Sequence, residues 1–194
     1  MDSATQSKRT LRARLRHDRE LAYTSESWLH IIQSLEFKSA KIVATYFSYG
    51  TEPQTVDINE ALIHAGKIVL LPRTLKNKEI EWVIWDGSPQ SLKKNGKVME
   101  PTGDTFKTLD EIDVVIVPAL SIDSEGNRIG QGGGSYDRAL SQIAAWKVGL
   151  VGEDELTHGY PVAASILHFD GVRSSGHIRL YRRLFALRRA VLVA

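Results

Sequence analysis

The chain has 194 residues, of which 42% are hydrophobic and 25% charged, a composition typical of one globular domain. The formal net charge of +2 is too small to indicate a nucleic acid partner, and the absence of cysteine excludes disulfides, thiolate metal sites and a cysteine nucleophile. No apolar run reaches the roughly 18 residues of a membrane span, and the first residues lack the apolar core of a signal peptide. We therefore expect a single cytoplasmic, monomeric domain over residues 1–194, with no nucleic acid or membrane partner.

The first predicted element is a basic helix from Ser7 to Ala22. Lys8 and Arg12 are spaced so that both lie on one face of this helix, one turn from each other. A solvated surface is the usual meaning of such a charge run, whereas a site for an anionic ligand is the sharper interpretation. The residues by themselves leave both interpretations open.

Helices and strands alternate in the next part of the chain. With Ser25 as its N-cap, a helix is predicted over Glu26 to Phe37, followed by a strand over Lys41 to Phe47. Aromatic residues gather at the end of this strand, where open α/β sheets bind their ligands. A further helix is predicted over Val56 to Ala65.

Two more strands are predicted, from Lys67 to Leu71 and from Glu81 to Trp85. Trp82 and Trp85 cannot face the same side of a regular strand, and we expect both to belong to the core. The polar, turn-rich stretch from Ser88 to Asp110 predicts an irregular excursion over the sheet.

The most informative stretch begins with the β-branched run Val114 to Val117, which suits a strand buried on both faces. A glycine-rich loop and a helix start follow this strand, and that order is a phosphate-binding layout because glycines let backbone N–H groups approach an anion. The loop lacks the Gly-Lys-Ser/Thr ending of a P-loop, and Ser135 stands where a dinucleotide motif has its last glycine. Phosphate binding and a tight connection without a ligand both remain open at this point.

A helix over Arg138 to Ala145 and a strand over Lys147 to Val151 complete the alternation. This pattern predicts an α/β fold: a single three-layer domain with a mostly parallel sheet and helices on both faces. The segment 177–194 is a basic and apolar tail, for which an interface helix and a docked terminal helix are both open, with membrane-surface or RNA binding as a weaker option.

The glycine loop and its flanks read Arg128-Ile129-Gly130-Gln131-Gly132-Gly133-Gly134-Ser135-Tyr136-Asp137. This string resembles the signature of the 5-formyltetrahydrofolate cyclo-ligase family, which is roughly Arg-Leu-Gly-x-Gly-x-Gly-Tyr-Tyr-Asp. Lys8 to Arg12 also matches a Lys-x-x-Leu-Arg motif near the family's N-terminus, and Glu52 with Thr55 matches a Glu followed three residues later by Thr. The resemblance covers about residues 8–160, and the tail departs from it.

The resemblance implies an enzyme that uses ATP and Mg²⁺ to convert 5-formyltetrahydrofolate, a reduced folate, to 5,10-methenyltetrahydrofolate. It implies catalytic roles for Lys8, Arg128 and Tyr136. It implies ATP binding by Lys8, Arg12, Arg128, Gly130, Gln131, Gly132, Gly133, Gly134, Ser135 and Tyr136. It also implies folate binding by Phe47 and Glu52, and Mg²⁺ binding by Asp137 and Asp170, although the family's Pro-x-Glu-x-His-Asp segment is altered around Asp170.

Two other classes of function are compatible with these residues. A sugar-phosphate isomerase or a related α/β enzyme would use the glycine loop for the phosphate of its substrate. A non-enzymatic nucleotide- or RNA-binding protein would use the basic ends of the chain and show a steep salt dependence without turnover. A relative that kept the fold and lost the folate activity is a further alternative.

Overall fold

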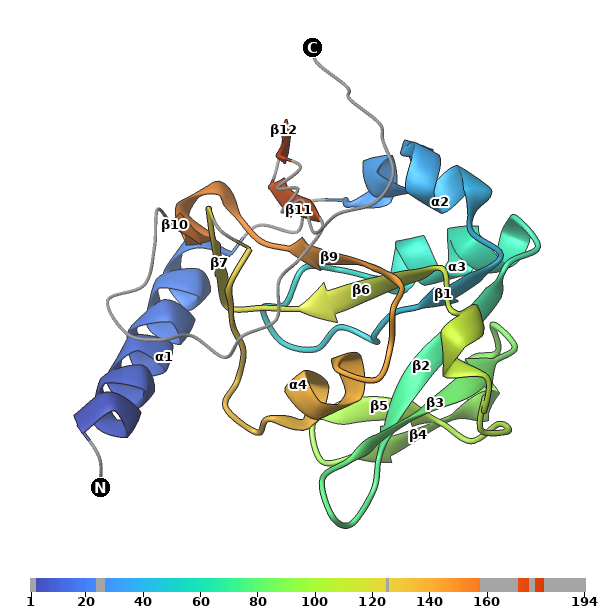
Figure 1. Cartoon of the computed structure of the whole chain (residues 1–194), viewed down its shortest axis with the longest axis horizontal. Coiled ribbons are helices and arrows are strands. Elements are labelled where there is room, and N and C mark those ends of the chain that lie inside the picture. Colours follow the sequence, from blue (N-terminus) through green and yellow to red (C-terminus); the bar gives the residue numbers. More distant parts are fainter. Residues whose placement is uncertain (1–2, 24–26, 125, 158–170, 175–176, 180–194) are drawn as a thin grey trace.

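The structure, a computed structural model, describes residues 3–23, 27–124, 126–157, 171–174 and 177–179. Its centre is a seven-stranded sheet with the strand order β12-β11-β9-β6-β1-β2-β3 (Figure 1). The strands are β1 Ile42–Ala44, β2 Ile68–Thr74, β3 Ile80–Trp85, β6 Val114–Pro118, β9 Trp146–Leu150, β11 Gly171–Ser174 and β12 His177–Arg179. All neighbours from β11 to β2 run parallel, whereas β3 and β12 join the two edges antiparallel. The predicted mostly parallel sheet is confirmed.

Helices cover both faces of this sheet, as predicted. One face carries the 3₁₀ helix η1 Leu29–Gln33, α2 Leu35–Ser39 and α3 Val56–His64, whose buried side chains pack with those of the strands in one cluster. The other face carries α4 Ser135–Leu140 and the turn after it. The long helix α1 Ser3–Ala22 lies beyond the carboxyl end of β6 (Figure 1).

The core is divided by the sheet into two main clusters. Val43 and Val69 face η1, α2 and α3, whereas Ala44 and Val115 face α4. Trp82 and Trp85 are 1% and 3% exposed and belong to opposite clusters, which confirms that both tryptophans are core residues. Burying large apolar side chains of this kind stabilises a fold by about 1.5–3 kcal/mol each.

Smaller elements surround the sheet. A β-hairpin is formed by β4 Leu92–Asn95 and β5 Val98–Pro101, and a three-stranded sheet by β10 Leu156–Thr157, β7 Ser121–Asp123 and β8 Arg128–Ile129. Three further 3₁₀ helices are short: η2 Pro89–Ser91, η3 Leu109–Glu111 and η4 Glu153–Glu155. Within the described residues, no helix combines the length and the apolar character that crossing a membrane would require.

Several predicted boundaries are wrong. The first helix begins at Ser3 instead of Ser7, and the strand predicted over residues 41–47 ends at Ala44. The helix predicted over residues 26–37 is two short helices, because Ser34 between them has an extended ψ of 158°. The strand predicted to end before Pro72 continues to Thr74 as the partner of β3. The helix after the glycine loop begins at Ser135 and ends at Leu140, five residues before the predicted end at Ala145.

The stretch from Ser88 to Asp110 also differs from its prediction, since it contains the β4–β5 hairpin instead of being irregular throughout. The predicted N-cap Ser25 lies outside the described residues, and of the basic tail 177–194 only β12 is described. A single domain over the whole chain therefore stays a prediction.

Candidate functional site

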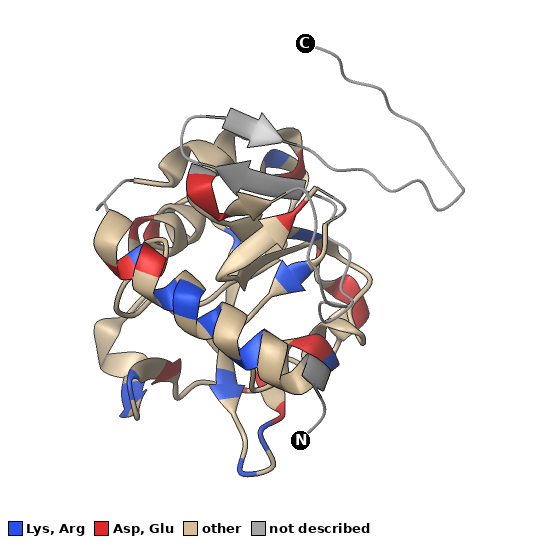
Figure 2. Cartoon of the chain, turned by 90° about the vertical axis from the view of Figure 1, so that its left-hand side faces the viewer, with Lys and Arg blue, Asp and Glu red and all other residues tan. Residues whose placement is uncertain are grey.

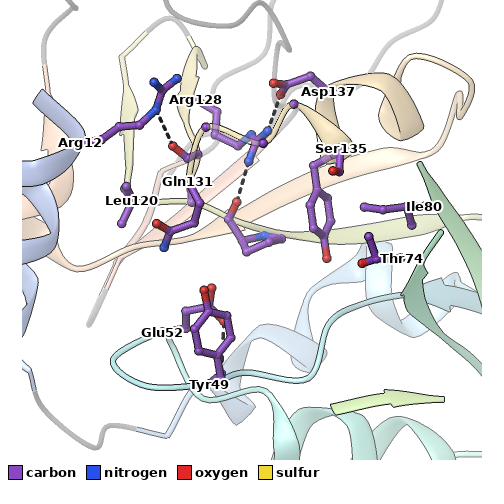
Figure 3. A pocket seen from close by; sticks show the side chains of 17 residues that line it. Arg12, Tyr49, Glu52, Thr74, Ile80, Leu120, Arg128, Gln131, Ser135 and Asp137 are labelled. Carbon is purple, nitrogen blue, oxygen red and sulfur yellow. Dashed lines mark hydrogen bonds and ion pairs between the residues drawn. The ribbon is translucent and has the colours of Figure 1, made fainter. Parts of the chain in front are cut away.

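A pocket of about 280 Å³ opens where the strands β1, β2 and β6 end. The chain leaves β1 toward α3 on one face of the sheet and leaves the neighbouring β6 toward α4 on the other face. Such a switch point is where open α/β sheets bind ligands. Figure 3 shows the glycine loop on one side of this pocket and Glu52 with Tyr49 on the opposite side.

The loop from Gly130 to Ser135 forms the first wall of the pocket. Gly132 and Gly134 have φ angles of 101° and 69°, which L-residues seldom adopt, so glycine is required at both positions by the backbone itself. A Cβ on Gly132 would also come within 3.3 Å of the Arg12 guanidinium. The glycines therefore let the backbone and a cation share a narrow space.

Helix α1 lies against this loop and brings two arginines to it. Arg12 Nε donates a hydrogen bond to the Gly130 carbonyl at 3.0 Å, and Arg16 Nε donates to Gln131 Oε1 at 3.0 Å. Lys and Arg bands recur along the exposed side of α1 in Figure 2. The loop itself has no charged side chain from Gly130 to Tyr136, so its positive charge comes from neighbouring elements.

One of these neighbours is Arg128, which is only 4% exposed and lines the pocket. Its Nη1 donates to the Pro118 carbonyl at 2.9 Å, and its Nη2 forms an ion pair with Asp137. Its guanidinium also lies 5.9 Å from the centre of the Tyr136 ring. These contacts hold a buried cation at one position behind the glycine loop.

Glu52 on the opposite wall is a buried carboxyl that is 8% exposed, and its Oε2 accepts a hydrogen bond from the Tyr49 N–H at 3.2 Å. Burial raises the pKa of Glu52 from its ordinary 4.5 to about 7, although the Tyr49 hydrogen bond and the charge of Arg19 act in the opposite direction. Burial and the nearby Glu52 also raise the pKa of Tyr49. Glu52 therefore changes its charge near neutral pH, which is common among groups in ligand sites.

Tyr136 forms a further part of the lining and packs edge-on against Trp82, with ring centres 6.3 Å apart. Burial and the charge of Glu52 raise the pKa of Tyr136, and Arg128 opposes this rise. Tyr136 is therefore a neutral phenol at physiological pH and offers a hydroxyl to a bound molecule.

The structure brings most of the predicted site residues together. The pocket is lined by Arg12, Glu52, Arg128, Gly130, Gln131, Gly132, Gly133, Gly134, Ser135, Tyr136 and Asp137. Lys8 is half-buried on α1 and does not belong to this lining. Phe47 does not line the pocket either, because it packs edge-on against the core residue Trp85 at 6.3 Å.

Asp137 and Asp170 are the two predicted Mg²⁺ ligands. Asp170 lies outside the described residues. In the described part of the chain, no group of three or more His, Cys, Asp or Glu residues is placed to hold a metal ion. Asp137 lines the pocket and is paired with Arg128. Because Mg²⁺ keeps several waters and binds substrate phosphates, a single protein carboxylate is sufficient, and Asp137 fits that role.

Six lining residues were not predicted as site residues: Tyr49, Pro118, Ala119, Leu120, Thr74 and Ile80. The first four lie at or beyond the ends of β1 and β6, whereas Thr74 and Ile80 lie elsewhere. Thr74 and Ile80 come from the end of β2 and the start of β3. The turn between these strands is held near the pocket by Arg138, whose Nη2 donates a hydrogen bond to the Lys78 carbonyl at 2.9 Å. Nothing in the local sequence indicates that this hairpin reaches the pocket.

Comparison with known proteins identifies relatives of this chain. The sequence model of the 5-formyltetrahydrofolate cyclo-ligase family matches residues 4–162. The 5-formyltetrahydrofolate cyclo-ligase of Mycolicibacterium smegmatis is 30% identical over 131 residues, which are 63% of this chain and 68% of that protein. The enzyme of the same name from Escherichia coli strain K12 is 33% identical over 130 residues, 63% of this chain and 71% of that protein. The NMR structure of Aquifex aeolicus 5,10-methenyltetrahydrofolate synthetase has a TM-score of 0.80 and 28% identity, covering 94% of this chain and 96% of that one.

Proposed function

The chain belongs to the 5-formyltetrahydrofolate cyclo-ligase family, and from this membership we propose that its pocket converts 5-formyltetrahydrofolate to 5,10-methenyltetrahydrofolate with ATP. The reaction releases ADP and phosphate, because the formyl oxygen is phosphorylated before N10 closes the ring. Such chemistry depends on positioning and on neutralising charge more than on a protein nucleophile.

The observation that carries this proposal is that the two walls of one pocket suit two different substrates. The glycine loop, with Arg12 and Arg128 beside it, offers backbone N–H groups and positive charge for phosphates. The opposite wall offers the buried Glu52 carboxyl and the Tyr49 ring, which suit the N–H edge and the face of a pterin. A site for a sugar phosphate alone would not require the second wall.

The chain's own residues have separate roles in this proposal. Arg12 and Arg128 hold and neutralise phosphate charge, and Glu52 orients the folate. Tyr136, kept neutral by its raised pKa, donates a hydrogen bond from its hydroxyl to the reacting groups. Asp137 would hold Mg²⁺, which would supply positive charge to neutralise the transferred phosphoryl group. Lys8 contributes charge from the next turn of α1, outside the pocket lining.

One assay tests the proposed function directly. Purified protein is incubated with 5-formyltetrahydrofolate and Mg²⁺, with and without ATP, and the absorbance of methenyltetrahydrofolate is followed. ATP-dependent product, lost when EDTA removes the metal, is expected. A protein that binds ATP without forming product would instead be the relative that has lost folate activity.

We also propose that the protein acts as a cytoplasmic monomer without a nucleic acid partner. This follows from its cysteine-free composition and small net charge, and from the position of its arginines at the pocket loop. Light scattering after size-exclusion chromatography should give the mass of a single chain, and RNA should not inhibit turnover at physiological salt.

A further inference from the structure

Arg19 is the most deeply buried cation of helix α1, although it is not part of the pocket lining. It is 6% exposed, and its Nε and Nη2 bind the two carboxylate oxygens of Glu155, the second at 2.7 Å. Nη2 also donates to the carbonyls of Ala119 at 2.7 Å and Leu120 at 3.3 Å. A single guanidinium therefore joins α1 to two separate segments of the chain.

Both segments lie at the pocket or beside it. Ala119 and Leu120 line the pocket directly after β6. Glu155 lies in η4, where its Oε2 also accepts the Gly152 N–H at 2.7 Å and its carbonyl accepts the Ser121 hydroxyl at 2.6 Å. The ion pair therefore connects α1 to the backbone next to the pocket, through the hydrogen bond between Glu155 and Ser121.

Arg19 lies on the same face of α1 as Arg12, which contacts the glycine loop. Arg12 precedes it by seven residues, which is close to two helical turns, so both lie on one face about 10 Å apart along the axis. The apolar contact of α1 with the wall is small, with Leu11 and Leu15 packing against the buried Leu120 and Ile129. Fixing α1 at Arg19 therefore limits how far Arg12 can move over the glycine loop.

A buried ion pair is a poor source of stability, because desolvation offsets much of its attraction, and it is better explained by the geometry that it specifies. We propose that Arg19 is a positioning residue, which through Glu155 and the carbonyls of Ala119 and Leu120 holds α1 so that Arg12 meets the phosphates at the glycine loop. The inference rests on the proposed function, since it assigns the phosphates to this loop.

Arg19 has a second, electrostatic effect on the opposite wall. Its positive charge lowers the pKa of Glu52, against burial, which raises it. The other titratable groups that interact with Glu52 are the phenols of Tyr46, Tyr49 and Tyr136. Without Arg19, Glu52 should keep its proton to higher pH. The pH at which folate binding reaches half of its maximum should then move upward in Arg19→Met.

The test compares Arg19→Met and Glu155→Gln with wild type, using calorimetry of ATP binding without folate, steady-state kinetics and circular dichroism. Misplacing a binding group by about 1 Å can cost up to about a hundredfold, so we expect each variant to weaken ATP binding by about tenfold or more. KM for ATP should rise more than KM for folate. Arg19→Lys keeps the charge without the two-pronged geometry and should lie between Arg19→Met and wild type.

Arg14→Met is the matched control, because Arg14 lies on the same helix and, among the described residues, forms an ion pair with Asp18 on the surface. It should bind ATP like wild type. Folded Arg19→Met and Glu155→Gln proteins with wild-type ATP affinity would overturn the inference. Loss of folding in both variants would also overturn it, since the pair would then serve stability alone. Absence of turnover in the wild type would instead contradict the proposed function, and the calorimetry would still test Arg19.

Discussion

Replacing Glu52 with Gln should stabilise the protein at alkaline pH while weakening folate binding. Glu52 is 8% exposed, and burial raises its pKa from 4.5 to about 7. The folded state therefore holds the proton more tightly than the unfolded state, so stability falls as pH rises from about 4.5 and is lowest above pH 7. At about 1.4 kcal/mol for each pH unit between the two values, the charged form costs about 3 kcal/mol at pH 8. Gln keeps the shape and an acceptor for the Tyr49 N–H without this cost.

The measurement is urea unfolding of wild type and Glu52→Gln at pH 5 and pH 8. The stability advantage of the variant should grow by about 2 kcal/mol between these two values. Glu60→Gln, which changes an exposed acid on α3, is the matched control. If the stability advantage is the same at both pH values, ionisation of the buried Glu52 does not destabilise the folded protein, and the argument is refuted. The same variant should bind folate about tenfold or more weakly, because it loses a charge-assisted hydrogen bond.

Other predictions follow from the glycine loop and from α1. Gly132→Ala should raise KM for ATP sharply because of its φ of 101°, whereas Gly133→Ala, whose Cβ would meet only a serine hydroxyl at 3.7 Å, should be nearly neutral in the same assay. Asp137→Asn should raise the Mg²⁺ concentration needed for half-maximal turnover, and an unchanged Mg²⁺ titration would show that Asp137 is not a ligand. The same variant should lose about 1–3 kcal/mol of folding stability in thermal unfolding, because the buried Arg128 loses its ion pair. Lys8→Ala should raise KM for ATP more than KM for folate, and equal effects on both would show that Lys8 is only a surface charge.

The strands of the sheet could be predicted well because their signal is local. The run from Val114 to Val117 is β-branched throughout, and in the structure it is buried on both faces between β1 and β9. The pair Trp82 and Trp85 could be assigned to opposite clusters from the period of a strand alone. In both cases neighbouring residues carry the whole pattern.

The short helices could not be predicted with the same success. The apolar residues from Trp28 to Phe37 have helical spacing, but Ile31 and Phe37 reach the core from two separate helices joined by the extended Ser34. Leu35, one of these apolar residues, is 70% exposed. Tertiary packing decides such boundaries, because the intrinsic preference for one continuous helix is small.

The site shows a similar division. Gly132 and Gly134 could be recognised as loop residues because a positive φ favours glycine. Phe47 was predicted as a folate contact near the end of β1; its ring packs edge-on against Trp85 and it does not line the pocket, so its role stays a prediction. A sequence predicts where a residue lies along the chain more reliably than the direction in which its side chain points, once the chain has left the regular strand.

The neutral character of the glycine loop links the docking of α1 to the chemistry of the pocket. From Gly130 to Tyr136 the loop has no charged side chain, so backbone amides alone would have to hold a polyanion there. Arg12 supplies charge from a helix that is separated from the loop by more than a hundred residues in sequence, and Arg128 supplies it from behind the loop. A cation on the loop itself would always be next to the bound phosphates. Arg12 is next to them only when α1 is packed against the loop. Any change that loosens α1 should therefore weaken phosphate binding even when every residue of the loop is intact.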